Sequence, residues 1–174
     1  GHENKLYEVC VTVEKKGDEI TFDMEGTSPQ APGFINCTES GMRGAILTGL
    51  LPILAPGTRW NEGVMRPVTI KAAEGILCNS SWPAPTSAGT VSAAWIVQNV
   101  VVAALSRLVA WSKQDATEGQ AVTKGHMMVM TLAGQDRDGG PFGTFLLDST
   151  AGGGGAFADH DGLDGSGDYV VPRP

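Results

Sequence analysis

Hydrophobic and polar residues alternate along the start of the chain, on both sides of a short polar turn. Residues 16–18 read Lys-Gly-Asp, and apolar side chains recur at alternate positions before and after them. A period of two residues is typical of strands that bury one face. The pattern predicts a β-hairpin whose apolar positions are Leu6, Val9, Val11, Val13, Ile20, Phe22 and Met24.

Two later segments have the spacing of helices. Residues 39–54, ESGMRGAILTGLLPIL, place apolar side chains on one side of a helix, and Pro56-Gly57 ends it. Residues 88–111 are apolar nearly all round, which predicts a long helix covered on most of its faces. The helical positions of the first segment are Met42, Ile46, Leu50 and Leu54.

The rest of the sequence predicts further strands and a loop. A short strand is expected over 66–72, and residues 126–150 are expected to form a second hairpin around 136–140. The tail from Gly152 is rich in Gly and Asp without periodicity, and predicts a Gly-rich C-terminal loop. The sequence therefore predicts an α+β fold with two β-hairpins, a long buried helix and a second helix, built as one segment over 1–174.

Composition narrows the functions that the chain can have. Its formal net charge is −7, its pI is near 4.8, and its 12 basic residues are scattered, which argues against nucleic acid or an anionic membrane as partner. The apolar stretches are shorter than a membrane span. Cys10, Cys37 and Cys78 are odd in number and widely spaced, so we expect free thiols in a cytoplasmic protein.

The common motifs of self-contained active sites do not occur. The sequence has no GxSxG elbow, no P-loop and no GxGxxG fingerprint, so an ATP site within this chain is not expected. Cys37 and Cys78 have no neighbouring His in sequence, and buried structural thiols are the default interpretation.

One cluster of potential metal ligands stands in the tail. Asp159, His160, Asp161 and Asp164 offer oxygen and imidazole donors that suit Mn²⁺, Zn²⁺ or Mg²⁺. Their spacing matches no metal motif, and Asp-Gly runs are usually turns. No metal site is therefore assigned to this chain.

Polar residues in two stiff loops are the first candidates for binding. In GTSPQAPGFIN, residues 26–36, two prolines restrict the backbone while glycines permit tight turns. The amides of Gln30 and Asn36 could face a substrate, or could satisfy backbone groups of the loop. Asn79, which precedes SSWPAP, has the same two interpretations.

A second candidate group lies in NEGVMRPV. Arg66 could bind a phosphate or carboxylate with both arms of its guanidinium, or could pair with Glu62. Asn61 lies in the same motif. Arg43, early in the first predicted helix, is assigned a surface ion pair.

Four motifs in order resemble the hydantoinase B/5-oxoprolinase family, which includes large subunits of acetone and acetophenone carboxylases. They are DMEGTSPQAPGFIN, NEGVMRPVTIKAAEGILCN, PAPTSAGTV and GGGGAFADHDGLD. Subunits of that family are several times longer, so the resemblance implies the central segment of one. Whether the chain is a piece or a short natural subunit stays open.

The resemblance implies part of an ATP-dependent, multi-subunit enzyme. ATP would be bound by a hydantoinase A-like partner subunit of a hetero-oligomer, and any divalent metal would lie in the complete enzyme outside this segment. Phe157 stands where many hydantoinase-type members of the family have an arginine. A phenylalanine there resembles the ketone-carboxylase side of the family, so the resemblance favours a carboxylase acting on a ketone. The alternatives are a cyclic-amide hydrolase of hydantoinase or oxoprolinase type, and a non-catalytic scaffold segment that mediates subunit assembly.

The motifs also imply a shared substrate site. Because family signatures distant in sequence are most simply explained by one site, we expect them to converge on one concave surface. There the glycines would let backbone N–H groups approach negative charge. The alternative is that these loops lie apart and each caps its own helix or strand. The expected substrate-binding residues are Gln30, Asn36, Asn61, Arg66, Asn79, Gly153 and Gly154, and catalytic residues are not assigned.

Overall fold

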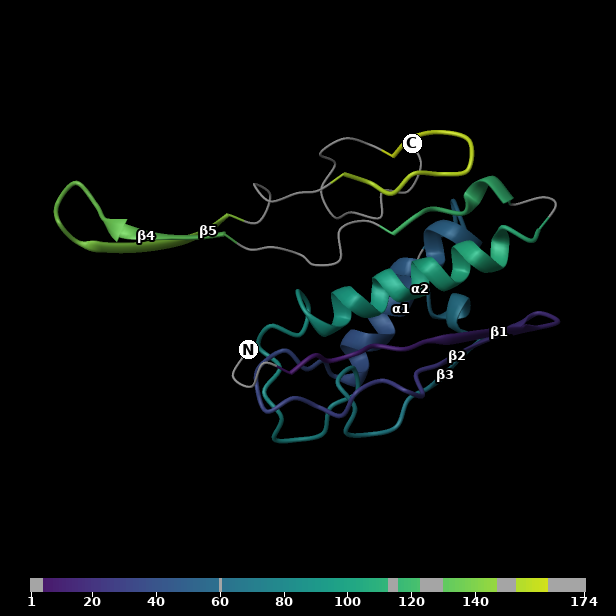
Figure 1. Cartoon of the computed structure of the whole chain (residues 1–174), viewed down its shortest axis with the longest axis horizontal. Coiled ribbons are helices and arrows are strands. Elements are labelled where there is room, and N and C mark those ends of the chain that lie inside the picture. Colours follow the sequence, from purple (N-terminus) through teal and green to yellow (C-terminus); the bar gives the residue numbers. More distant parts are fainter. Residues whose placement is uncertain (1–4, 60, 113–115, 123–129, 147–152, 163–174) are drawn as a thin grey trace.

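The computed structural model describes residues 5–59, 61–112, 116–122, 130–146 and 153–162. The architecture is α+β, with two α-helices and two small sheets (Figure 1). In the described part of the chain, no helix is long and apolar enough to cross a membrane. The elements are β1 Thr12–Lys16, β2 Glu19–Asp23, α1 Glu39–Leu54, the 3₁₀ turn η1 Glu62–Met65, β3 Val68–Lys71, α2 Ala93–Val109, the 3₁₀ turn η2 Ala116–Glu118, β4 Met130–Gln135 and β5 Pro141–Leu146.

The first sheet has the strand order β1-β2-β3. β1 and β2 form the predicted antiparallel hairpin, and β3 pairs parallel to β2, with Ile70 opposite Phe22. β1 begins later than the apolar alternation because the preceding chain bonds to a loop. The Ser28 N–H donates to the Glu8 carbonyl at 2.9 Å, which takes this stretch out of the ladder.

The first helix has the predicted bounds. Thr38 precedes α1, and its hydroxyl accepts from the Gly41 N–H at 3.3 Å, which satisfies one of the free donors of the first turn. α1 packs against α2 where Gly49 lies close to Val101: a Cβ at Gly49 would stand 3.0 Å from the valine methyl. The glycine therefore lets the two helices approach closely.

The second helix is shorter than the sequence predicts. α2 begins at Ala93, not at residue 88, because residues 88–92 turn against the loop before α1. The Ala88 N–H donates to the Phe34 carbonyl at 3.0 Å, and the Gly89 N–H donates to the Thr86 carbonyl at 2.9 Å. Tertiary contacts thus override the apolar run.

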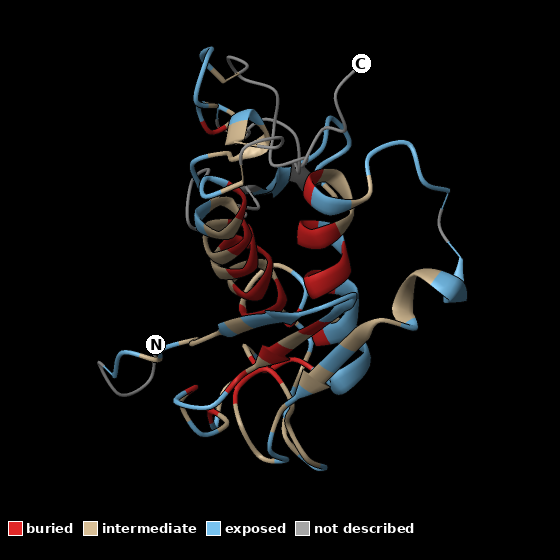
Figure 2. Cartoon of the chain, turned by 90° about the vertical axis from the view of Figure 1, so that its right-hand side faces the viewer, coloured by how far each residue is buried: buried red, intermediate tan, exposed pale blue. Residues whose placement is uncertain are grey.

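The core lies between the sheet and the two helices (Figure 2). The buried stretches of both helices face the buried residues of β2. Arg107, in the last turn of α2, is exposed. The largest fully buried side chains are Phe22, Met24, Asn36, Met42, Ile46, Cys78, Val97, Val101 and Leu105.

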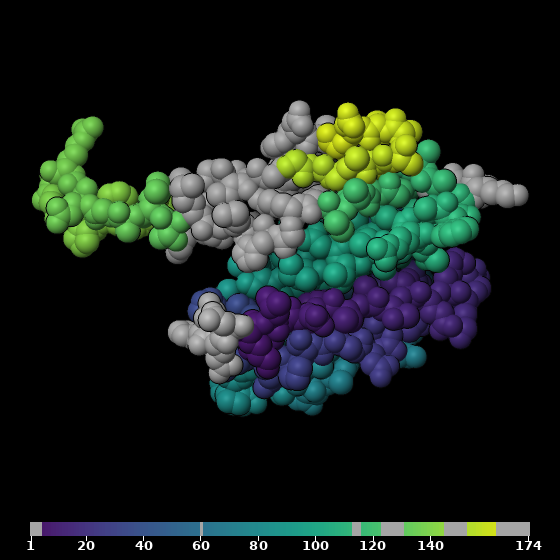
Figure 3. Space-filling model, viewed as in Figure 1, coloured from purple at the N-terminus to yellow at the C-terminus, as the bar shows by residue number. Residues whose placement is uncertain are grey.

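The second predicted hairpin is formed by β4 and β5, which extend away from the body as an arm (Figures 1 and 3). The Asp136 N–H donates to the Gly140 carbonyl at 2.8 Å and closes the turn. Of the expected glycine-rich loop, residues 153–162 are described, and they carry a single bridge between Phe157 and Gln120. The rest of that expectation lies outside the described residues.

Candidate functional site

Two of the signature loops form one body. The loop 26–36 and the loop 75–81 run side by side, joined by backbone hydrogen bonds at Ser28, at Gln30 and at Cys37, which follows the first loop. The Gln30 N–H donates to the Gly75 carbonyl at 2.8 Å, and the Leu77 N–H donates to the Ser28 carbonyl at 2.9 Å. This geometry brings together two of the motifs that the sequence separates.

The Asn36 amide holds this body from within. Its side chain is fully buried, and its Oδ1 accepts from the Ala31 N–H at 2.6 Å. Its Nδ2 lies 2.9 Å from the carbonyl oxygens of Ala31, Gly33 and Pro85. The amide thereby satisfies backbone groups of the loop 26–36 and of Pro85, just after the second loop, that would otherwise be without partners.

The other two loop amides have similar contacts. Gln30 Oε1 accepts from the Ser81 N–H at 2.9 Å, and Asn79 Nδ2 donates to the Ala72 and Ala73 carbonyls at 3.2 and 3.3 Å. All three amides therefore bond backbone groups of the loops or of the chain directly before them. A contact of any of them with substrate stays a prediction.

The segment 61–66 presents one cation. Asn61 caps η1, with its Oδ1 accepting from the Gly63 N–H at 2.8 Å. Arg66 follows η1 and is exposed. Among the described residues no carboxylate lies within ion-pair distance of Arg66, so the alternative pairing with Glu62 is not formed. The Arg66 guanidinium is thus available to an anion.

A polar pocket of about 220 Å³ lies beside this segment. It is bounded by the first turns of α1, by Met65, by β3 and by Asn79. Arg43 and Glu39 face each other at its edge, with Nη1 and Oε1 4.0 Å apart, which gives Arg43 the expected ion pair. Sequence reasoning missed Glu39; an acidic residue four positions before an arginine in a helix is the signal that would have found it.

The glycine run, described from Gly153 onward, lies away from the signature loops. The Ala121 N–H donates to the Ala156 carbonyl at 2.8 Å, and a Cβ at Gly155 would overlap the Ala121 carbonyl. The segment 153–162 therefore packs against 119–122 over α2, on the side of the helices away from the sheet (Figure 1). The expectation that all four motifs share one surface is wrong, because the helix layer separates Gly153 and Gly154 from the signature loops.

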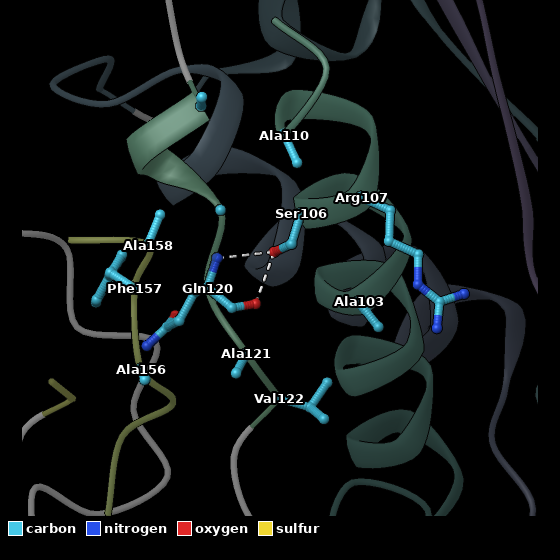
Figure 4. Close-up of a pocket in the computed structure, with 12 residues that line it drawn as sticks. Ala103, Ser106, Arg107, Ala110, Gln120, Ala121, Val122, Ala156, Phe157 and Ala158 are labelled. Carbon is cyan, nitrogen blue, oxygen red and sulfur yellow. Dashed lines mark hydrogen bonds between the residues drawn. The ribbon is translucent and has the colours of Figure 1, made fainter. Parts of the chain in front are cut away.

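A second cavity, of about 490 Å³, lies between that segment and the end of α2 (Figure 4). Half of its lining residues are alanines, and Phe157 stands on one wall. Ser106 Oγ donates to the Gln120 carbonyl at 2.8 Å and accepts from the Gln120 N–H at 3.0 Å, which fixes the wall against α2. The cavity holds few polar groups for chemistry.

The His-carboxylate cluster forms a compact turn. His160 Nδ1 lies 2.7 Å from Asp159 Oδ1, and the imidazole stacks on Phe157 with ring centroids 4.5 Å apart. Within the described ranges, no three His, Cys, Asp or Glu side chains are grouped so that they could hold a metal ion. Asp164 lies outside the described residues.

The cysteines are free. Burial raises the pKa of the Cys78 thiol to about 11, and burial also raises the pKa of Cys37. A thiol with a raised pKa is a poor nucleophile at neutral pH because the thiolate is the reactive form. These geometries favour structural roles for both side chains.

The sequence profile of the hydantoinase B/oxoprolinase family matches residues 2–172. The chain belongs to this family. Over 137 residues it is 33% identical to the B-type subunit of a putative D-/L-hydantoinase from Pseudomonas sp. (strain NS671), covering 75% of this chain and 22% of that protein. The chain thus spans about a fifth of this relative's length.

Two solved structures contain the same fold. An ATP-dependent caprolactamase from Pseudomonas jessenii superposes with a TM-score of 0.72 at 28% identity, over 92% of this chain and 27% of that one. A nucleotide-free acetone carboxylase superposes with a TM-score of 0.75 at 16% identity, over 92% of this chain and 21% of that one. The second likeness, at this low identity, concerns the fold alone.

Proposed function

We propose that the chain is part of a subunit of an ATP-dependent enzyme that opens cyclic amides. The observation that carries this proposal is the 28% identity to a caprolactamase across the whole fold, with a TM-score of 0.72. The 33% identity to a putative hydantoinase subunit supports the same class, since both relatives are named for cyclic amides.

The second candidate is carboxylation of a ketone. It rests on Phe157, which resembles the carboxylase side of the family and lines the larger cavity. The likeness to acetone carboxylase supports the fold of this candidate but adds nothing to its substrate. Cyclic-amide opening is therefore the better supported of the two.

The polar pocket beside α1 is the proposed contribution of this chain to the substrate site. Arg66 follows Met65, which lines the pocket, and its guanidinium has no carboxylate partner among the described residues. A planar guanidinium binds a phosphorylated or carboxylated group through two parallel hydrogen bonds. We assign to Arg66 the binding of negative charge on the substrate, beside the pocket that Asn79 helps to line.

The remaining predicted site residues are proposed to have other roles. Gln30, Asn36 and Asn61 keep the loops and η1 in place through the contacts already described. The backbone of Gly153 and Gly154 is proposed to meet substrate or a neighbouring subunit on the other side of α2.

ATP supplies the phosphoryl group that activates an otherwise unreactive carbonyl. The chain is acidic and has no nucleotide-binding motif, so ATP is proposed to bind to a hydantoinase A-like partner subunit of a hetero-oligomer. Any divalent metal of the complete enzyme is proposed to be held outside this segment. The part of this chain is to position the carbonyl compound.

The proposal is tested with the complete enzyme. ATP hydrolysis is measured with a panel of hydantoins and lactams, and in parallel with ketones plus bicarbonate. We expect ATP hydrolysis that depends on a cyclic amide. Hydrolysis that depends on a ketone and bicarbonate together would establish the second candidate in its place.

A further inference from the structure

The signature loops end in exposed aromatic residues that the proposed substrate site does not use. Trp82 is 95% exposed and Phe34 is 54% exposed. Both stand in loops that the hydrogen bonds of Gln30, Asn36 and Ala88 join into one body. Exposed prolines flank them at positions 32, 83 and 85.

The two loops contain no charged residue. Residues 26–38 and 75–92 contain no Asp, Glu, Lys, Arg or His, although the chain as a whole has a net charge of −7. Buried cores of protein interfaces are depleted of charged residues and enriched in aromatic ones. We name the exposed part of the two loops, Pro32, Phe34, Trp82, Pro83 and Pro85, the aromatic-proline surface.

The loops below this surface are rigidly built. Pro32, Pro83 and Pro85 restrict the backbone, and the fully buried Asn36 amide ties Pro85 to the loop that carries Phe34. Little conformational freedom is then lost when the aromatic side chains are covered, which favours binding. Rigid aromatic anchors on preorganised loops are the typical hot spots of protein contacts.

The lengths of the relatives indicate what covers the surface. This fold, matched over 92% of the chain, makes up only 27% and 21% of the two solved chains. In such chains about three quarters of the polypeptide is available to pack against it, at the high effective concentration that a covalent link gives.

We propose that the aromatic-proline surface is an internal interface, covered by the remaining part of the longer polypeptide to which the family's segment belongs. The occupant is an uncharged, apolar protein surface that receives Trp82 and Phe34. The large exposed apolar side chains of these loops are then core residues of the complete subunit. The inference rests on family membership and does not depend on which reaction the enzyme catalyses.

Hydroxyl-radical footprinting of the complete polypeptide, as the cell makes it, tests this directly. The oxidation rates of Trp82 and Phe34 are measured by mass spectrometry in the native and the urea-unfolded protein. We expect native protection of about tenfold or more at Trp82, as for a buried anchor. An oxidation rate of Trp82 close to that of the unfolded protein overturns the proposal. The same result overturns it if the natural polypeptide proves to consist of these 174 residues alone.

The same experiment separates the other occupants. Protection that disappears on dilution identifies a second copy, and protection that appears only with substrate or with another subunit identifies those partners; each of these results overturns the proposal. Trp82→Ser is then compared with Trp111→Ser, since Trp111 is 90% exposed and lies beyond α2, outside the two loops. We expect Trp82→Ser to lower the urea midpoint of the complete polypeptide, and equal effects of the two variants contradict the assignment.

Discussion

The side chain of Asn36 is bonded to the backbone of Pro85, with Nδ2 and the carbonyl oxygen 2.9 Å apart across 49 positions of sequence. The same amide closes the loop that it ends, through Ala31 and Gly33. One buried side chain thus fixes the relative position of two family signatures. The stability of both loops should therefore depend on this amide.

Replacing Asn36 by Ala removes the partner of the buried Ala31 N–H and of three carbonyl oxygens. Buried polar groups without partners are costly, so the free energy of unfolding is expected to fall by about 3 kcal/mol. Urea unfolding followed by circular dichroism measures the change. Asn36→Asp, which keeps the shape and the acceptor but loses the donors, is also expected to destabilise.

Asn61→Ala is the matched control. Asn61 also accepts from a backbone N–H and donates to the Arg59 carbonyl at 2.8 Å, but both bonds are exposed and local, so its loss is expected to cost about 1 kcal/mol or less. Equal effects at Asn36 and Asn61 would show that the link between the loops contributes little.

Local patterns predicted most of the fold. The bounds of α1 follow from its helical spacing and the Pro-Gly that succeeds it, and the first hairpin follows from alternation around Gly17. The parallel pairing of β3 with β2 was not predicted, because it depends on the packing of α1, which lies between these strands in sequence. The start of α2 was missed because it too depends on tertiary contacts, since the Ala88 N–H donates to the Phe34 carbonyl.

The candidate site was predicted less completely. The sequence singled out Asn79 and the segment ending at Arg66, which the structure places around one pocket or directly beside it. It left open whether the loop amides face a substrate or the backbone, because one partner of Asn36 lies 49 positions away. The separate position of the glycine run follows from the pairing of Phe157 with Gln120, which has no local signal.

Gly89 permits the close approach of the second loop to the first. A Cβ at this position would stand 2.5 Å from the Asn36 carbonyl oxygen, and that backbone cannot move easily. Gly89→Ala is expected to lower the free energy of unfolding by about 1–3 kcal/mol. Gly33→Ala, where a Cβ would meet nothing within 4 Å, serves as control in the same urea titration. Equal stabilities of the two variants would show that the loops do not need a glycine at position 89.

The buried thiols are expected to be slow to react. Burial raises the pKa of Cys78 from 9.0 to about 11, so at pH 8 its thiolate fraction is small, and its access is limited. Labelling with iodoacetamide, read by mass spectrometry, should modify Cys78 about tenfold or more slowly than the half-buried Cys10. Labelling of both at one rate would show that the loops open readily.

Arg66→Ala tests the proposed contact with the substrate. In the complete enzyme kcat/KM is expected to fall by about tenfold or more, because a charged contact to the substrate is lost. The free energy of unfolding should change by less than about 1 kcal/mol, since Arg66 is exposed. Arg59→Ala, an exposed neighbour, should leave both quantities unchanged. A loss of stability that matches the loss of activity would assign Arg66 a structural role.

The assignment to cyclic-amide opening is tested most directly by the product. The complete enzyme is incubated with ATP and a lactam or hydantoin in the presence of ¹³C-bicarbonate, and the products are identified by mass spectrometry together with the ADP formed. The account predicts a ring-opened, unlabelled product in proportion to the ADP. A ¹³C-carboxylated ketone formed in a parallel reaction, with no ring opening of any cyclic amide, would contradict it.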